Sequence, residues 1–74
     1  MESHRPIIYF EISYAGEQVF CDAVMEERSY EIFFDGLFKC ELANFENDWQ
    51  ILSGAIVPKE TVDQIGLCIE DWLE

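Results

Sequence analysis

Basic residues are scarce in this chain, and acidic residues dominate its charge. Four lysines and arginines face sixteen aspartates and glutamates, so the formal net charge of the 74 residues is −12. Anionic lipid and nucleic-acid phosphates repel such a chain, and we expect it to bind neither directly. Half of its residues are nevertheless hydrophobic, whereas disorder requires low hydrophobicity together with high charge. The composition therefore predicts a single small acidic domain over residues 1–74.

Histidine and cysteine are too few, or too widely spaced, for the common catalytic and metal sites. His4 is the only histidine, so we expect no Ser-His-Asp or Cys-His pair and an inert His4. Cys21, Cys40 and Cys68 are odd in number and lack the spacing of a disulfide framework or a zinc site. Reduced thiols in a protein core are typical of the cytoplasm. The sequence therefore predicts a cytoplasmic protein that is not an enzyme, with no catalytic residues and no cofactor.

Long hydrophobic runs are also missing from the sequence. A membrane span needs about 20 consecutive apolar residues, and residues 1–6 lack the charged and apolar regions of a signal peptide. The acidic loop at residues 44–48 spaces its oxygens as a calcium loop does. Trp49, however, occupies the position of the required glycine, and Ala55 that of the bidentate glutamate. We therefore expect no membrane association and no metal site.

Alternating apolar and polar residues predict strands in the first half of the chain. Residues 7–14 and 17–24 alternate on either side of a glycine-containing pair at 15–16, which is typical of a two-residue hairpin turn. That turn pairs Tyr14 with Glu17 and keeps the apolar residues of both strands on one face. A slip of one residue would mix apolar and polar positions, so the pattern selects this register.

A second hairpin is predicted around the Asp-Gly pair at residues 35–36. A two-residue turn would place Ile32 opposite Lys39 and would mix apolar and charged side chains on one face. A three-residue loop instead places Ile32 opposite Phe38. It also sets Glu31 opposite Lys39, an opposite-charge pair that contributes roughly 0.2–1 kcal/mol. We therefore predict the three-residue loop.

The remaining pattern completes an α+β fold, an antiparallel β-meander of four to five strands with one C-terminal α-helix packed on one face. A strand at 30–34 precedes the second turn, a fourth strand ends near Ala43, and 49–52 form a short fifth strand. Pro58 is well placed at the first turn of the helix. Gly66 lies on the apolar stripe at a cost of about 1 kcal/mol relative to alanine, so we expect the helix to approach the sheet closely there. The predicted core consists of Ile8, Phe10, Ile12, Val19, Cys21, Tyr30, Ile32, Phe34, Phe38, Cys40 and Leu42 from the sheet, and Val62, Ile65, Ile69, Trp72 and Leu73 from the helix.

The opposite face of the predicted sheet has no second helix to cover it. Its residues are both acidic and aromatic, and only Lys39 offsets their charge. Aromatic residues on an open surface are typical of protein recognition, although scattered exposed aromatics are also common in sheets. The candidate partner-binding residues are Tyr9, Glu11, Phe20, Asp22, Glu31, Phe33 and Glu41.

These features together predict a small acidic protein-binding module, an inhibitor or immunity-type protein that occupies a basic surface of a partner protein. Basic surfaces often hold nucleic acid, so the carboxylates would act as a nucleic-acid mimic. The alternative is a homo-oligomeric structural or subunit module with no inhibitory role, such as a homodimer formed through an edge strand. A third interpretation is that the charge serves solubility alone.

Overall fold

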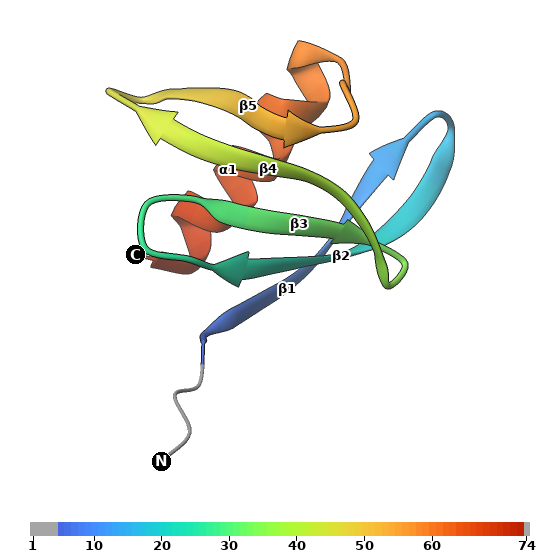
Figure 1. The fold of residues 1–74 in the computed structure, drawn as a ribbon. Coiled ribbons are helices and arrows are strands. Elements are labelled where there is room, and N and C mark those ends of the chain that lie inside the picture. Colours follow the sequence, from blue (N-terminus) through green and yellow to red (C-terminus); the bar gives the residue numbers. More distant parts are fainter. Residues whose placement is uncertain (1–4, 74) are drawn as a thin grey trace.

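The chain folds into one antiparallel sheet followed by one helix (Figure 1). The computed structural model describes residues 5–73, so the prediction for His4 lies outside the described residues. The strands lie side by side in the order β1-β2-β3-β4-β5, which confirms the predicted α+β meander. No helix within residues 5–73 is long and apolar enough to cross a membrane. The elements are β1 (Ile7–Tyr14), β2 (Glu17–Met25), β3 (Tyr30–Phe34), β4 (Leu37–Phe45), β5 (Asp48–Gly54) and α1 (Lys59–Leu73).

The β1–β2 hairpin has the predicted register. Tyr14 lies opposite Glu17, and the pairing continues without interruption along the whole of β1. Ala15 and Gly16 have φ values of 55° and 80°, as expected for the type I′ turn that matches the twist of the flanking strands. The turn and the alternation of the strands thus specify the same pairing.

The predicted register of the β3–β4 hairpin is wrong. The turn contains only residues 35–36, and the register then shifts, so that Ile32 lies opposite Cys40 instead of Phe38. Lys39 has no partner in this pairing and is the extra residue of a β-bulge. The bulge allows a two-residue turn without placing Lys39 opposite Ile32, which is the arrangement that the apolar pattern disfavours.

The bulge also sends two side chains to the faces opposite to those expected. Phe38 leaves the predicted core, because it lies opposite Phe33 and is 50% exposed. Lys39 turns away from Phe33 toward two rings at the end of the sheet. Its Nζ lies 5.1 Å from the centre of the Tyr14 ring and 5.5 Å from that of Phe34, within the range of a cation–π interaction.

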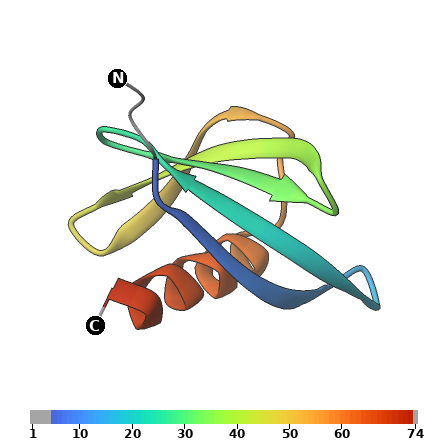
Figure 2. The ribbon, with the colours of Figure 1, turned by 90° about the horizontal axis from the view of Figure 1, so that it is seen from below.

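The core lies between the sheet and α1. Figure 2 shows the helix along one side of the curved sheet, where it contacts both edge strands, β1 and β5. A Cβ at Gly66 would lie 2.4 Å from Trp49 Cδ1, which confirms the predicted close approach of helix and sheet. The apolar core consists of Ile8, Ile12, Val19, Cys21, Ala23, Ile32, Phe34, Cys40, Leu42, Trp49, Val57, Val62, Ile65 and Ile69.

The core differs from the prediction at the end of α1 as well as at Phe38. Trp72 and Leu73 are 53% and 52% exposed. Helical spacing places them on the apolar stripe, but the stripe continues beyond the part of the helix that the strands cover. Trp49 and Val57, which the prediction did not include, belong to the core and are only 5% and 3% exposed.

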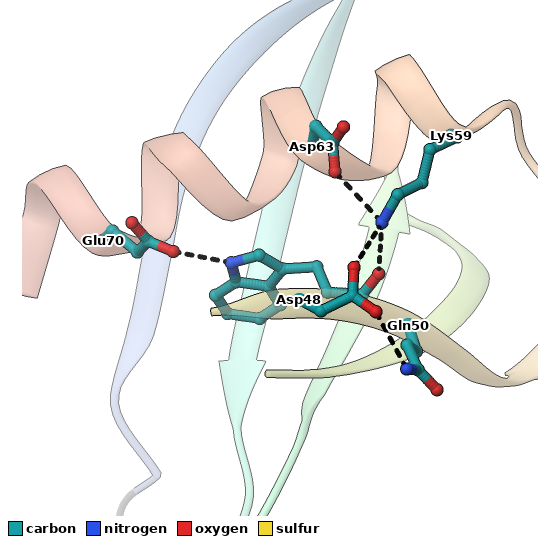
Figure 3. A network of polar contacts seen from close by, with 6 residues as sticks. Asp48, Gln50, Lys59, Asp63 and Glu70 are labelled. Carbon is teal, nitrogen blue, oxygen red and sulfur yellow. Dashed lines mark hydrogen bonds and ion pairs between the residues drawn. The ribbon is translucent and has the colours of Figure 1, made fainter. Parts of the chain in front are cut away.

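Polar contacts fasten α1 to β5 (Figure 3). Lys59 Nζ lies 2.9 Å from Asp48 Oδ1 and 3.3 Å from Asp63 Oδ1, and it donates a hydrogen bond to Trp49 O at 3.0 Å. Further along the helix, Trp49 Nε1 donates to Glu70 Oε2 at 2.7 Å. These contacts hold the helix on one side of the sheet.

Candidate protein-binding face

The seven predicted binding residues lie on one side of the sheet. Ile8, Cys21, Ile32 and Cys40 are buried under α1, and successive residues of a strand point to opposite faces. No element within residues 5–73 packs on the other side (Figure 2). We call this side the open face. Its residues are Tyr9, Glu11, Phe20, Asp22, Glu31, Phe33 and Glu41, as predicted, together with Phe38.

Aromatic rings form much of the open face. The register places Tyr9 beside Asp22, Asp22 beside Phe33, and Phe33 beside Phe38, so these residues cross four strands in one row. The rings of Phe33 and Phe38 meet edge to face, with their centres 5.7 Å apart. Tyr9 and Phe20 are 69% and 61% exposed. Rings of this size usually contribute to stability by burial, and here they face solvent.

A shallow hollow of about 270 Å³ lies between β1 and β2 on this side. Gln18 Nε2 donates a hydrogen bond to Glu11 Oε1 at 2.9 Å, which orients the Glu11 carboxylate. The hollow therefore combines carboxylate oxygens with exposed rings. It is lined by Tyr9, Phe10, Glu11, Phe20, Cys21 and Asp22.

Glu31 and Glu41 lie at the other end of the open face. They are directly opposite each other, so the predicted pair of Glu31 with Lys39 does not form. Two hydroxyl groups compensate for this juxtaposition: Ser29 Oγ donates to Glu41 Oε2 at 2.5 Å, and Ser53 Oγ donates to Glu41 Oε1 at 3.2 Å. The half-buried Glu41 carboxylate thus accepts two hydrogen bonds from its own chain, whereas the exposed Glu11 accepts one, from Gln18.

The open face carries no basic side chain from its strands. Lys39 is the only lysine or arginine in β1 to β5, and the bulge directs it toward Tyr14 and Phe34. The prediction that Lys39 offsets the charge of this face is therefore wrong. The signal for the bulge, and for Phe38 on the open face, was the Asp-Gly pair at 35–36, which favours a two-residue turn more strongly than a longer loop.

The cysteines have the chemistry of core residues. Cys21, Cys40 and Cys68 are free thiols; the first two are buried and Cys68 is half-buried. Burial raises the pKa of all three, and burial together with the neighbouring Cys68 raises the pKa of Cys21 to about 12. A thiol with a raised pKa is a poor nucleophile and a poor metal ligand at neutral pH.

The open face brings the exposed carboxylate of Glu11 and the half-buried carboxylate of Asp22 together with the exposed rings of Tyr9 and Phe20. Comparison with protein-family models, curated proteins and solved structures finds no match. The binding preference of the open face therefore has to be inferred from its own side chains. Carboxylates attract lysine and arginine, and aromatic rings accept their cationic heads and aliphatic stems.

Proposed function

We propose that the protein is a small binding module whose open face occupies a basic surface of a partner protein. One observation carries the proposal: Glu11 and Asp22 lie beside the exposed rings of Tyr9 and Phe20, on a face to which the strands contribute no basic side chain. Charge complementarity of this kind accelerates association and selects the partner. The rings provide the large apolar contacts that dominate binding energy at many interfaces.

The partner class that fits best is a protein whose basic surface binds nucleic acid. Such surfaces hold lysine and arginine side chains that neutralise phosphates, and carboxylates can occupy the same positions. The net charge of −12 also draws the module toward a basic site from a distance. Bound in this way, the protein would act as an inhibitor or an immunity-type protein that keeps nucleic acid away from its partner.

The test is a titration against a set of basic nucleic-acid-binding proteins at low and high salt, with two matched double variants. Glu11→Gln with Asp22→Asn removes two charges from the open face. Glu27→Gln with Asp71→Asn removes two exposed charges from other parts of the surface. Close charge pairs contribute about 1.5 kcal/mol or more each at interfaces, so we expect roughly 100-fold weaker binding for the first variant. The second should lose less than about threefold, because surface charges away from an interface contribute little.

The aromatic contribution has its own matched pair of variants. Tyr9→Ala with Phe20→Ala should weaken binding at least tenfold, whereas Trp72→Ala, an exposed ring on α1, should leave it unchanged. Competition by a nucleic acid that binds the same partner supports the proposed inhibition. Absence of association with every basic protein at low salt would count against the proposal, as would equal losses in the two charge variants. Self-association through the open face would instead favour a homo-oligomeric module.

A further inference from the structure

The two edges of the sheet differ in how their backbone groups are covered. At the β5 edge, Lys59 Nζ donates to Trp49 O at 3.0 Å, and a register shift after Glu41 makes the β4–β5 pairing irregular. A lysine over the edge and a bulge are common ways to prevent another strand from pairing. The β1 edge has neither. Its eight residues contain no proline and no lysine, and their pairing with β2 is regular throughout.

The hydrogen bonds of β1 show which backbone groups are left for another strand. Met25 N donates to Pro6 O at 2.9 Å, and hydrogen-bonded pairs alternate along an antiparallel ladder. Every second residue of β1 therefore points its N–H and C=O toward β2, and the others point theirs outward. Within the described part of the chain, β1 pairs with β2 alone. The outward-pointing groups belong to Ile7, Tyr9, Glu11 and Ser13.

Two hollows lie on either side of this edge. The hollow of the open face includes Tyr9 and Glu11. A second hollow, of about 360 Å³, lies on the helix side, between Ser13 and the first half of α1. A strand added to β1 would direct alternate side chains toward the open face and toward α1. The lining of the second hollow is Ser13, Glu60, Thr61, Asp63, Gln64 and Leu67.

We propose that β1 receives an extended basic segment of the partner protein, which pairs with the β1 edge as a sixth strand and places lysine or arginine side chains in both hollows. The proposal rests on the proposed function, because it takes the basic character of the partner from there. Strand addition of this type obtains affinity from main-chain hydrogen bonds and specificity from pockets for alternate side chains. Both hollows fit long basic side chains, since each contains carboxylates and an apolar surface for the stem.

The test uses a ten-residue peptide in which pairs of lysines alternate with pairs of valines, so that a strand presents lysine on both faces, and the same peptide with every backbone nitrogen methylated. The two peptides carry the same charge, but the second cannot donate main-chain hydrogen bonds. We expect the first to bind at least tenfold more tightly. Amide hydrogen exchange of Tyr9, Glu11 and Ser13, which we expect to be fast in the free protein because these amides face outward, should slow at least tenfold in the complex. The exchange of Phe10 and Ile12, whose amides already face β2, should change little.

A pair of protein variants tests the edge directly. Ser13→Pro removes an outward N–H that β2 does not use, whereas Ser13→Ala keeps it. We expect peptide binding to be at least tenfold weaker in the first variant than in the second. The methylated peptide makes the test independent of whether Ser13→Pro folds.

Each remaining result overturns the inference. Equal affinity of the two peptides, or unchanged exchange at Tyr9 and Glu11 in the complex, would mean that charge alone binds them. The proposed function would then stand without strand addition. If the protein binds neither peptide but still binds basic proteins through Glu11 and Asp22, the proposed function also stands and strand addition is excluded. If the amides of Tyr9, Glu11 and Ser13 exchange slowly without peptide, and more slowly at higher protein concentration, the β1 edge pairs with a second copy of the chain.

Discussion

Replacement of Gly66 by alanine tests how α1 packs on the sheet, because two effects of opposite sign meet there. Alanine favours a helix interior over glycine by about 1 kcal/mol. The added Cβ, however, would lie 2.4 Å from Trp49 Cδ1 and 2.5 Å from Trp49 Nε1. Non-bonded carbon atoms normally approach to about 3.5–4.0 Å, so the indole would have to retreat by roughly 1 Å.

Retreat of the indole weakens two interactions. Overpacking of a well-packed core costs about 1–3 kcal/mol. Trp49 Nε1 also donates a hydrogen bond to Glu70 Oε2 at 2.7 Å. A hydrogen bond to a charged group contributes about 1.5–3 kcal/mol, and part of this contribution is lost when the indole moves away from the half-buried Glu70. We therefore expect Gly66→Ala to lower the free energy of unfolding by about 2 kcal/mol after the helix-propensity gain. In a domain of this size the melting temperature should fall by roughly 10 °C.

Urea unfolding followed by far-ultraviolet circular dichroism measures this change without relying on tryptophan fluorescence. Comparison of Gln64→Ala with Gln64→Gly, at an exposed position of the same helix, gives the propensity difference alone. In a Trp49→Leu background the obstacle is gone, and Gly66→Ala should stabilise the protein by up to about 1 kcal/mol. A stabilising Gly66→Ala in the wild-type chain, or the same change in both backgrounds, would refute the packing described here.

Two further predictions concern ionisable groups. Hydrogen bonds from Gln50 and Lys59 lower the pKa of Asp48 below its usual value of 3.8, so its contribution to stability is present above that pH and is lost as the pH falls through the lower folded value. The difference in urea midpoint between wild type and Asp48→Asn should therefore be constant near pH 6 and shrink progressively as the pH falls below 3.8; a difference independent of pH would contradict this. Burial raises the pKa of Cys21 to about 12 and also raises that of Cys40, so a thiolate-specific reagent at pH 8 should label these thiols at least about 100-fold more slowly in the native protein than in urea. Rapid native labelling of either residue, located by mass spectrometry, would show that it is not in the core.

The β1–β2 hairpin could be predicted in full because all the information lies within the hairpin. Eight alternating residues on each side and a turn that accepts positive φ leave only one register with a uniform apolar face. The position of α1 on one side of the sheet followed in the same way, from the apolar stripe that includes Val62 and Ile65. The local sequence pattern was sufficient to predict the structure wherever the apolar residues of an element identify its buried face.

The bulge at Lys39 depends on residues outside the β3–β4 hairpin as well as on the two-residue turn at 35–36. Ala55 N donates to Lys39 O at 2.8 Å, so the bulge is also held by a residue that follows β5. Gly54 has a φ of 92°, and a Cβ there would lie 2.6 Å from Cys40 Cα. The bulge and this glycine fit together although they are far apart in the chain. The predicted fifth strand ends at residue 52, so its pattern does not connect Gly54 with the bulge.

Trp49 shows a similar limit. The prediction that Gly66 allows close approach of the sheet is confirmed, yet the pattern did not identify the ring that occupies the space. The strand that holds Trp49 is short and irregular, so its alternation is too brief to assign a face. Only the three-dimensional arrangement places the indole between Gly66 and Tyr30, whose ring centre lies 5.6 Å away.

The error at Lys39 bears directly on the proposed function. The predicted three-residue loop would place Lys39 opposite Glu31 on the open face and would bury Phe38. The bulge reverses both assignments, since Lys39 lies over Tyr14 and Phe34 while Phe38 meets Phe33 on the open face. The face is therefore more acidic and more aromatic than the alternation of the strands predicts. A basic partner meets no opposing charge from these strands, and one irregular residue accounts for the difference.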